Sequence, residues 1–161
     1  MSTVKRLGIA ALAVGSFYAS NVFAADAFVG TWVLNASKSK LPGGVMPDSV
    51  MMVVTDAGGG KYSTVSDTKM SGITSHSEIT FALDGKEYTP VTTPAQPGMP
   101  PVTQASQRVS DSSYTTSVKV GGELIATTLS EVSSDGKSLT MTTKGEGQYA
   151  AVSSVMVFDR K

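Results

Sequence analysis

Short runs of Thr, Ser and Val, separated by glycine-rich turns, are the feature of this chain that most constrains its fold. Turn signals occur at residues 56–60, 84–85, 121–122 and 134–137. β-branched residues favour extended backbone, and Gly accepts the positive φ that tight hairpins require. We find no long window with apolar residues at helical spacing. The sequence therefore predicts an all-β chain, and connections this short favour antiparallel pairing.

About 8–10 strands are expected, and nearly every neighbouring pair is joined by a tight turn. The predicted strands are residues 28–35, 49–55, 61–70, 73–83, 86–91, 102–109, 114–120, 123–132, 138–144 and 150–159. Segments 73–83 and 86–91 are expected to pair around Asp84-Gly85 as a hairpin. We predict a closed up-and-down β-barrel, because closure removes exposed strand edges.

Proline interrupts this strand pattern between Pro90 and Pro101. Because Pro lacks the N–H that a sheet ladder needs, residues 92–101 are expected to form an extended loop. Such a loop could cover a barrel mouth as a stiff lid with Met99 as its apolar tip, or it could be a spacer. The sequence leaves these two readings open.

The N-terminus has the order of features found in a signal peptide. Lys5 and Arg6 form a basic start, and residues 7–17 form an apolar run too short to span a bilayer. Residues 22–24 place small or modest side chains before the expected cleavage point. We therefore predict a signal peptide at residues 1–24, cleaved after Ala24, and a single domain at residues 25–161. The alternative is a buried N-terminal helix, which fits this order of features less well. The expected location is the bacterial periplasm or the extracellular medium.

Charge and cysteine content exclude several classes of function. Removing Lys5 and Arg6 leaves 11 basic and 13 acidic residues, a net charge of −2 with His neutral. This balance gives no steering toward nucleic acid or anionic lipid, so neither partner is expected. The chain has no Cys, which rules out disulfides, thiol nucleophiles and Cys metal sites. No second long apolar run follows residue 24, so stable membrane insertion after cleavage is not expected.

The segment Gly30-Thr31-Trp32, at the start of the first predicted strand, resembles the Gly-X-Trp signature of lipocalins and their calycin relatives. The resemblance implies a barrel whose base is closed by Trp32. It also implies that a basic residue near the end of the last strand packs on that ring, and Arg160 occupies this position. We expect Trp32 and Arg160 to form a structural pair at the barrel base.

A wider likeness covers most of the expected mature chain. The runs GTWVLNASKSKLP, DGKEY, SSDGKSLTM and VFDRK together resemble a set of uncharacterised bacterial secreted lipocalin-like (calycin-type) proteins. These motifs are turn and strand punctuation and carry no chemistry. No clear second or third lipocalin motif is present apart from the terminal basic residue. The likeness therefore implies the barrel more strongly than it implies a lipocalin ligand.

Residues that could carry catalysis or bind metal are sparse. His76 is the only His and shares a polar strand face with Glu78, where it could be a general base or metal ligand. A solvent-facing position is the favoured interpretation. No Gly-X-Ser-X-Gly nucleophile turn occurs, and the acidic residues are scattered. Met51 and Met52 are adjacent on a strand and point to opposite faces, which disfavours a copper site. We expect no enzyme activity and no cofactor.

Two functions remain open. The first is an exported barrel that binds a small apolar or amphipathic molecule, since small side chains fill a barrel poorly. The candidate pocket residues are Tyr62, Phe81, Met99, Tyr114 and Phe158. The second is a non-catalytic envelope structural or interaction module with a packed barrel core. In either case a monomer is expected.

Overall fold

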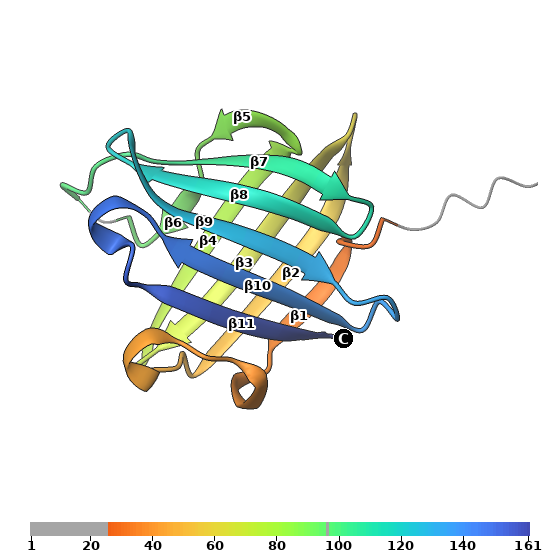
Figure 1. Ribbon diagram of the computed structural model, residues 1–161, viewed down its shortest axis with the longest axis horizontal. Coiled ribbons are helices and arrows are strands. Elements are labelled where there is room, and N and C mark those ends of the chain that lie inside the picture. Colours follow the sequence, from red (N-terminus) through yellow and green to blue (C-terminus); the bar gives the residue numbers. More distant parts are fainter. Residues whose placement is uncertain (1–25, 96) are drawn as a thin grey trace, which may run out of the picture.

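The computed structural model describes residues 26–95 and 97–161, which form one antiparallel sheet of 11 strands. The sheet curls so that β7 to β11 cross in front of β1 to β4 (Figure 1). Its strands are β1 (Gly30–Leu34), β2 (Ser49–Gly58), β3 (Lys61–Met70), β4 (Ile73–Ala82), β5 (Asp84–Tyr88), β6 (Val91–Thr93), β7 (Val102–Ser110), β8 (Ser113–Val120), β9 (Glu123–Val132), β10 (Ser138–Gly145) and β11 (Ser153–Arg160). The predicted all-β, up-and-down barrel class is confirmed, with 11 strands rather than 8–10.

Within the described ranges, three short 3-10 helices interrupt the strands, and there is no α-helix. They are η1 (Ala36–Lys38), η2 (Pro42–Gly44) and η3 (Gly147–Tyr149). The Asn35 side chain caps η1 by accepting a hydrogen bond from the Lys38 backbone N–H. Over the same described part of the chain, no helix has the length and hydropathy needed to cross a bilayer. The predicted signal peptide, residues 1–24, lies outside the described residues.

The sheet does not close into a continuous hydrogen-bonded ladder; its two edges are joined by the chain itself. The strand order is β5-β7-β8-β9-β10-β11-β1-β2-β3-β4-β6. Its edge strands β5 and β6 are consecutive in sequence, and only Thr89 and Pro90 separate them. Near one end, the backbone N–H of Arg108 on β7 donates to the carbonyl of Leu83, just after β4. The interior is therefore bounded on this side by a two-residue crossing rather than by a full ladder.

The hairpin predicted at Asp84-Gly85 is wrong. β5 pairs with β7, placing Glu87 opposite Ala105, while β4 pairs instead with β3 and β6. The Asp84 carboxylate accepts from the Lys86 backbone N–H, and Gly85 has a φ of 77°. These local contacts produce a bulge within β5, where the register with β7 shifts. The Asp-Gly pair bends the chain from one layer to the other without reversing it.

The best-packed part of the core lies at the end of the barrel crossed by residues 27–29. Trp32 is fully buried there, and its indole N–H donates to the Phe28 carbonyl at 2.9 Å. The Arg160 guanidinium lies over the Trp32 ring, 4.2 Å from its centroid. Leu139 and Phe158 are each 2% exposed beside this pair. We call this end the closed end.

Arg160 also ties the closed end together by hydrogen bonds. Its three side-chain nitrogens donate to the carbonyls of Ala27, Val29 and Gly136, at 2.6, 2.6 and 2.5 Å. Gly30 is needed beside it, because a Cβ at this position would lie 2.5 Å from an Arg160 nitrogen. The Gly-X-Trp segment and the last strand thus meet in one unit.

Candidate functional site

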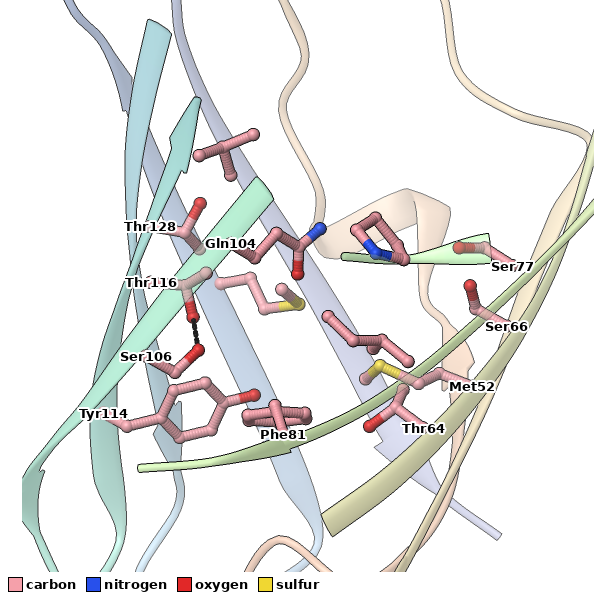
Figure 2. Close-up of a pocket in the computed structure, with 14 residues that line it drawn as sticks. Met52, Thr64, Ser66, Ser77, Phe81, Gln104, Ser106, Tyr114, Thr116 and Thr128 are labelled. Carbon is pink, nitrogen blue, oxygen red and sulfur yellow. Dashed lines mark hydrogen bonds between the residues drawn. The ribbon is translucent and has the colours of Figure 1, made fainter. Parts of the chain in front are cut away.

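A cavity of about 270 Å³ lies between the two layers of the barrel. Its lining comes from the inner faces of β2, β3, β4, β7, β8, β9 and β10, together with Pro90 at the β5–β6 crossing (Figure 2). The lining residues are Met52, Thr64, Ser66, Ser77, Ile79, Phe81, Pro90, Gln104, Ser106, Tyr114, Thr116, Val118, Thr128 and Met141. The period of two in each strand explains this set, because alternate side chains face inward.

Aromatic rings form the floor of the cavity toward the closed end. The Phe81 and Tyr114 rings lie 6.3 Å apart, and Tyr114 packs edge-on against Phe28 at 4.8 Å. Phe28 in turn packs against Tyr62 at 6.3 Å. Each ring comes from a different strand or from the segment before β1. The aromatic layer therefore separates the cavity from the polar groups of the closed end.

One wall of the cavity is rich in hydroxyl groups. Ser106 and Thr116 are hydrogen-bonded across β7 and β8 at 2.8 Å. Thr128 is bonded to Thr143 across β9 and β10, also at 2.8 Å. The hydrogen bond within each pair uses only part of what the two hydroxyls can donate and accept. Each hydroxyl can therefore form a further hydrogen bond with a ligand. This wall can bind a polar atom without carrying a charge.

Tyr114 adds a hydroxyl to the same wall, and Ser130 lies next to it as a fully buried residue outside the cavity lining. They lie directly opposite each other in the β8–β9 register, so both side chains are on the inner face. Burial raises the pKa of the Tyr114 phenol, and the neighbouring Ser130 hydroxyl offsets part of that rise. Ser130 is fully buried, and its Oγ has no hydrogen-bond partner among the described residues. A buried hydroxyl without a partner is unusual, because desolvation costs free energy.

A second hollow of about 460 Å³ lies outside the cavity at the β5–β6 crossing. It shares Ser77, Pro90 and Gln104 with the cavity lining. Its outer side is formed by the loop after β6, where Met99 is 58% exposed. The shared residues connect the interior to the surface between β4 and β7. This gap is the candidate mouth.

The closed end holds a charged network beneath the aromatic floor. The Arg108 guanidinium, which is partly exposed to solvent, donates to the Asp26 carboxylate at 3.2 Å and to the Tyr62 hydroxyl at 2.5 Å. Tyr62 donates in turn to Asp26. Burial, and then the Asp26 carboxylate, raise the pKa of Tyr62 to about 12. The Arg108 guanidinium also lies 5.6 Å from the centroid of the Phe28 ring. Its charge is thus neutralised within the network.

The five pocket residues proposed from sequence occupy three different places. Phe81 and Tyr114 line the cavity. Tyr62 and Phe158 are buried in the core cluster of the closed end and do not line it. Met99 lies at the outer hollow. Whether any of them contacts a ligand stays a prediction.

Sequence reasoning missed most of the polar lining. The candidates from sequence are large aromatic and Met side chains, so they do not include the hydroxyl wall or Gln104. The available signal was strand alternation: Gln104 and Ser106 share one face of β7, and Tyr114, Thr116 and Val118 share one face of β8. Alternation does not say which face turns inward, so the fold was needed.

His76 lies on β4 with its side chain away from the cavity. Its Nδ1 is 2.7 Å from the Asp67 carboxylate and its Nε2 is 2.9 Å from that of Glu78. Hydrogen bonds to Glu78 and then Asp67 raise the pKa of His76. Both ring nitrogens are occupied, and the described residues contain no group of three or more His, Asp and Glu able to hold a metal. The cluster is an exposed polar clip between β3 and β4.

The barrel is similar in fold, at low sequence identity, to the solved structures of a fatty acid binding protein and of a fluorescent protein. A Schistosoma mansoni fatty acid binding protein in complex with arachidonic acid has a TM-score of 0.61 at 15% identity, covering 84% of this chain and 97% of that one. The fluorescent protein UnaG has a TM-score of 0.59 at 17% identity, covering 83% of this chain and 97% of that one. The fold is shared. No protein-family profile matches the chain, and no curated protein matches it.

Proposed function

We propose that this protein binds a small apolar or amphipathic molecule in the cavity between its two layers and performs no catalysis. The observation that carries the proposal is the cavity of about 270 Å³ at the centre of the barrel, which connects to the surface beside Pro90. Ligand sites are typically concave, mostly apolar and marked by a few polar groups. The aromatic floor and the hydroxyl wall match this description.

The comparisons support the same proposal through fold alone. One similar barrel was solved with arachidonic acid bound, which establishes that this architecture can hold a lipid. Proteins that share a fold at low sequence identity often bind different ligands. The ligand of this protein must therefore be inferred from the residues that line its cavity. The rival hypothesis of a packed barrel core would require a solid interior. The interior described here is hollow between β3 and β8.

Binding is favoured over catalysis because of where the titratable groups lie. His76 is on the outer face, and Arg108 and Arg160 are engaged at the closed end. The hydroxyls on the cavity wall pair with one another rather than with a general base. A nucleophile needs an adjacent base or a lowered pKa, whereas burial raises the pKa of the Tyr114 phenol.

The proposal can be tested by native mass spectrometry of the protein purified from its own source. Any bound molecule would then be extracted and identified. Displacement of an environment-sensitive fluorescent probe would give affinities. Thr116→Phe places a large ring on the cavity wall and should reduce probe binding at least tenfold. Thr115→Phe is the matched control, because Thr115 is next to Thr116 in the sequence but does not line the cavity. Equal loss in both variants, with both folded by circular dichroism, would refute the cavity as the site.

Export is part of the proposal. We propose that the protein acts as a monomer in the bacterial periplasm or outside the cell, and the predicted signal peptide supports the location. N-terminal sequencing of the native protein would test this directly. A mature chain that begins at Ala25 is expected. A native chain that retains Lys5 and Arg6 would refute cleavage.

A further inference from the structure

We infer that the cavity selects an uncharged ligand carrying a hydroxyl or carbonyl group, and that it excludes ionised carboxylates and ammonium groups. The inference deepens the proposed function and rests on it. Its starting point is the lining: among the described residues, the 14 that line the cavity include no Asp, Glu, Lys, Arg or His. An ionised ligand group would therefore enter a low-dielectric space without a counter-charge.

The cations nearest the interior are not available to balance such a group. Arg108 is bound to the Asp26 carboxylate and the Tyr62 hydroxyl, beneath the ring of Phe28. Arg160 lies on Trp32 and gives its side-chain nitrogens to three backbone carbonyls. Recruiting either cation would require breaking these contacts and opening the aromatic floor. The closed end is thus electrostatically complete without a ligand.

The cost of burying an unpaired carboxylate decides against it. Transfer of an isolated ionised carboxylate into a protein interior is so unfavourable that the group takes up a proton instead. A carboxylic acid with an ordinary pKa of about 4.3 is only about one part in a thousand protonated near pH 7.5. If the cavity accepts only the neutral form, apparent affinity for the acid falls about tenfold for each pH unit above that pKa. An alcohol with the same chain has no such penalty.

The wall offers hydrogen bonds suited to a neutral polar group. Tyr114 extends its hydroxyl into the cavity, and the amide of Gln104 projects from the opposite end of the same wall (Figure 2). Hydroxyls and amides can both donate and accept, so they can satisfy a ligand hydroxyl or carbonyl.

The cavity volume limits the ligand to a modest size. An apolar protein cavity of about 150 Å³ holds one benzene molecule. The volume here, about 270 Å³, is nearly twice as large. A chain of roughly ten carbons or a two-ring compound is the expected class. Longer molecules would have to extend through the mouth beside Pro90 into the outer hollow.

The test compares three probes with the same ten-carbon chain: decanol, decanoic acid and decylamine. The affinity of each compound is measured near pH 7.5 by its displacement of a fluorescent reporter dye from the full mature protein. For decanoic acid the affinity is also measured between about pH 5 and pH 7.5. Decanol should bind at least tenfold more tightly than either charged probe near pH 7.5. The affinity for decanoic acid should fall about tenfold per pH unit while that for decanol stays flat.

Three results would overturn the inference. Decanoate binding as tightly as decanol near pH 7.5, or decanoic acid affinity independent of pH, would show that the cavity accepts the anion. Tight decylamine binding would show that it accepts a cation. In these cases the proposed function still stands, since a ligand is bound. If none of the three probes binds, both the proposed function and this inference fail.

A variant pair locates the polar contact. Tyr114→Phe removes one hydroxyl from the cavity wall, while Tyr149→Phe makes the same change at an exposed position outside it. Tyr114→Phe should weaken decanol binding about threefold to tenfold, as expected for one neutral hydrogen bond, and leave binding of decane unchanged. Gln104→Met is a second variant at the mouth end. Unchanged decanol affinity in both Tyr114→Phe and Gln104→Met would refute the role of this wall.

Discussion

Replacing Trp32 by Ala is the sharpest test of how the barrel is held together. The side chain is fully buried, so its loss leaves a cavity at the closed end. Truncation of a buried Trp to Ala costs about 3–5 kcal/mol of unfolding free energy. Loss of the Arg160 contact, with the guanidinium 4.2 Å from the ring centroid, accounts for about 1 kcal/mol of that total.

The magnitude matters because small domains have unfolding free energies of only about 5–15 kcal/mol. Trp32→Ala should therefore remove a large fraction of the stability and lower the urea midpoint strongly. The Phe28 carbonyl, which accepts from the indole N–H, would also lose its partner. Phe28 packs on Tyr62 and Tyr114, so loosening should spread to the cavity floor.

Equilibrium urea unfolding followed by circular dichroism is the appropriate measurement, because Trp32 is the only Trp and the variant lacks its fluorescence. Trp32→Phe should lie between wild type and Trp32→Ala. Met99→Ala, at an exposed loop position, is the control and should change stability by less than about 0.5 kcal/mol. A change below about 1 kcal/mol for Trp32→Ala would refute the closed-end account.

Four further predictions follow from the same contacts. Arg160→Met should cost about 2–4 kcal/mol, measured by urea unfolding, because three bonds to backbone carbonyls are lost. Tyr62 has its pKa raised to about 12, so the folded state holds its proton where the unfolded state, near 10, releases it. The contribution of Tyr62 to the free energy of unfolding should thus be fully present below about pH 10 and be lost between about pH 10 and 12. The loss of stability over this range should be smaller in Tyr62→Phe. An NMR titration of His76, the only His, should give a pKa above 6.5 that decreases in Asp67→Asn. The contribution of His76 to stability is then present at low pH and lost as pH rises through that pKa. Ser130→Ala removes an unpartnered buried hydroxyl and should leave the thermal midpoint unchanged or raise it slightly.

Most of the strand pattern could be predicted, because it depends on local chemistry. Turn residues and β-branched runs predict the bounds of strands such as β3, β8 and β9 to within one residue. The error at Asp84-Gly85 is instructive, since the same dipeptide suits both a tight turn and a bulge. Which one forms depends on whether the following strand finds a better partner, and β5 finds β7. That choice is not encoded in residues 84–88 alone.

The candidate site was less predictable than the fold. Two of the five aromatic or Met candidates, Phe81 and Tyr114, line the cavity. Tyr62 and Phe158 resemble them in chemistry and alternation but belong to the core cluster and do not line the cavity. The two pairs of residues differ in their distance from the closed end, and this distance is set only when the sheet curls. It cannot be predicted from the size and polarity of a side chain.

The sequence by itself determined that this chain forms antiparallel strands around a Gly-X-Trp opening, because period-two patterning and glycine turns act over a few residues. The tertiary structure alone decided what the interior can bind. Arg108 and Asp26 are 82 positions apart, and their pairing beneath Phe28 removes a cation from the cavity. Such long-range pairing depends on how the layers close, so the uncharged cavity is a property of the assembled barrel.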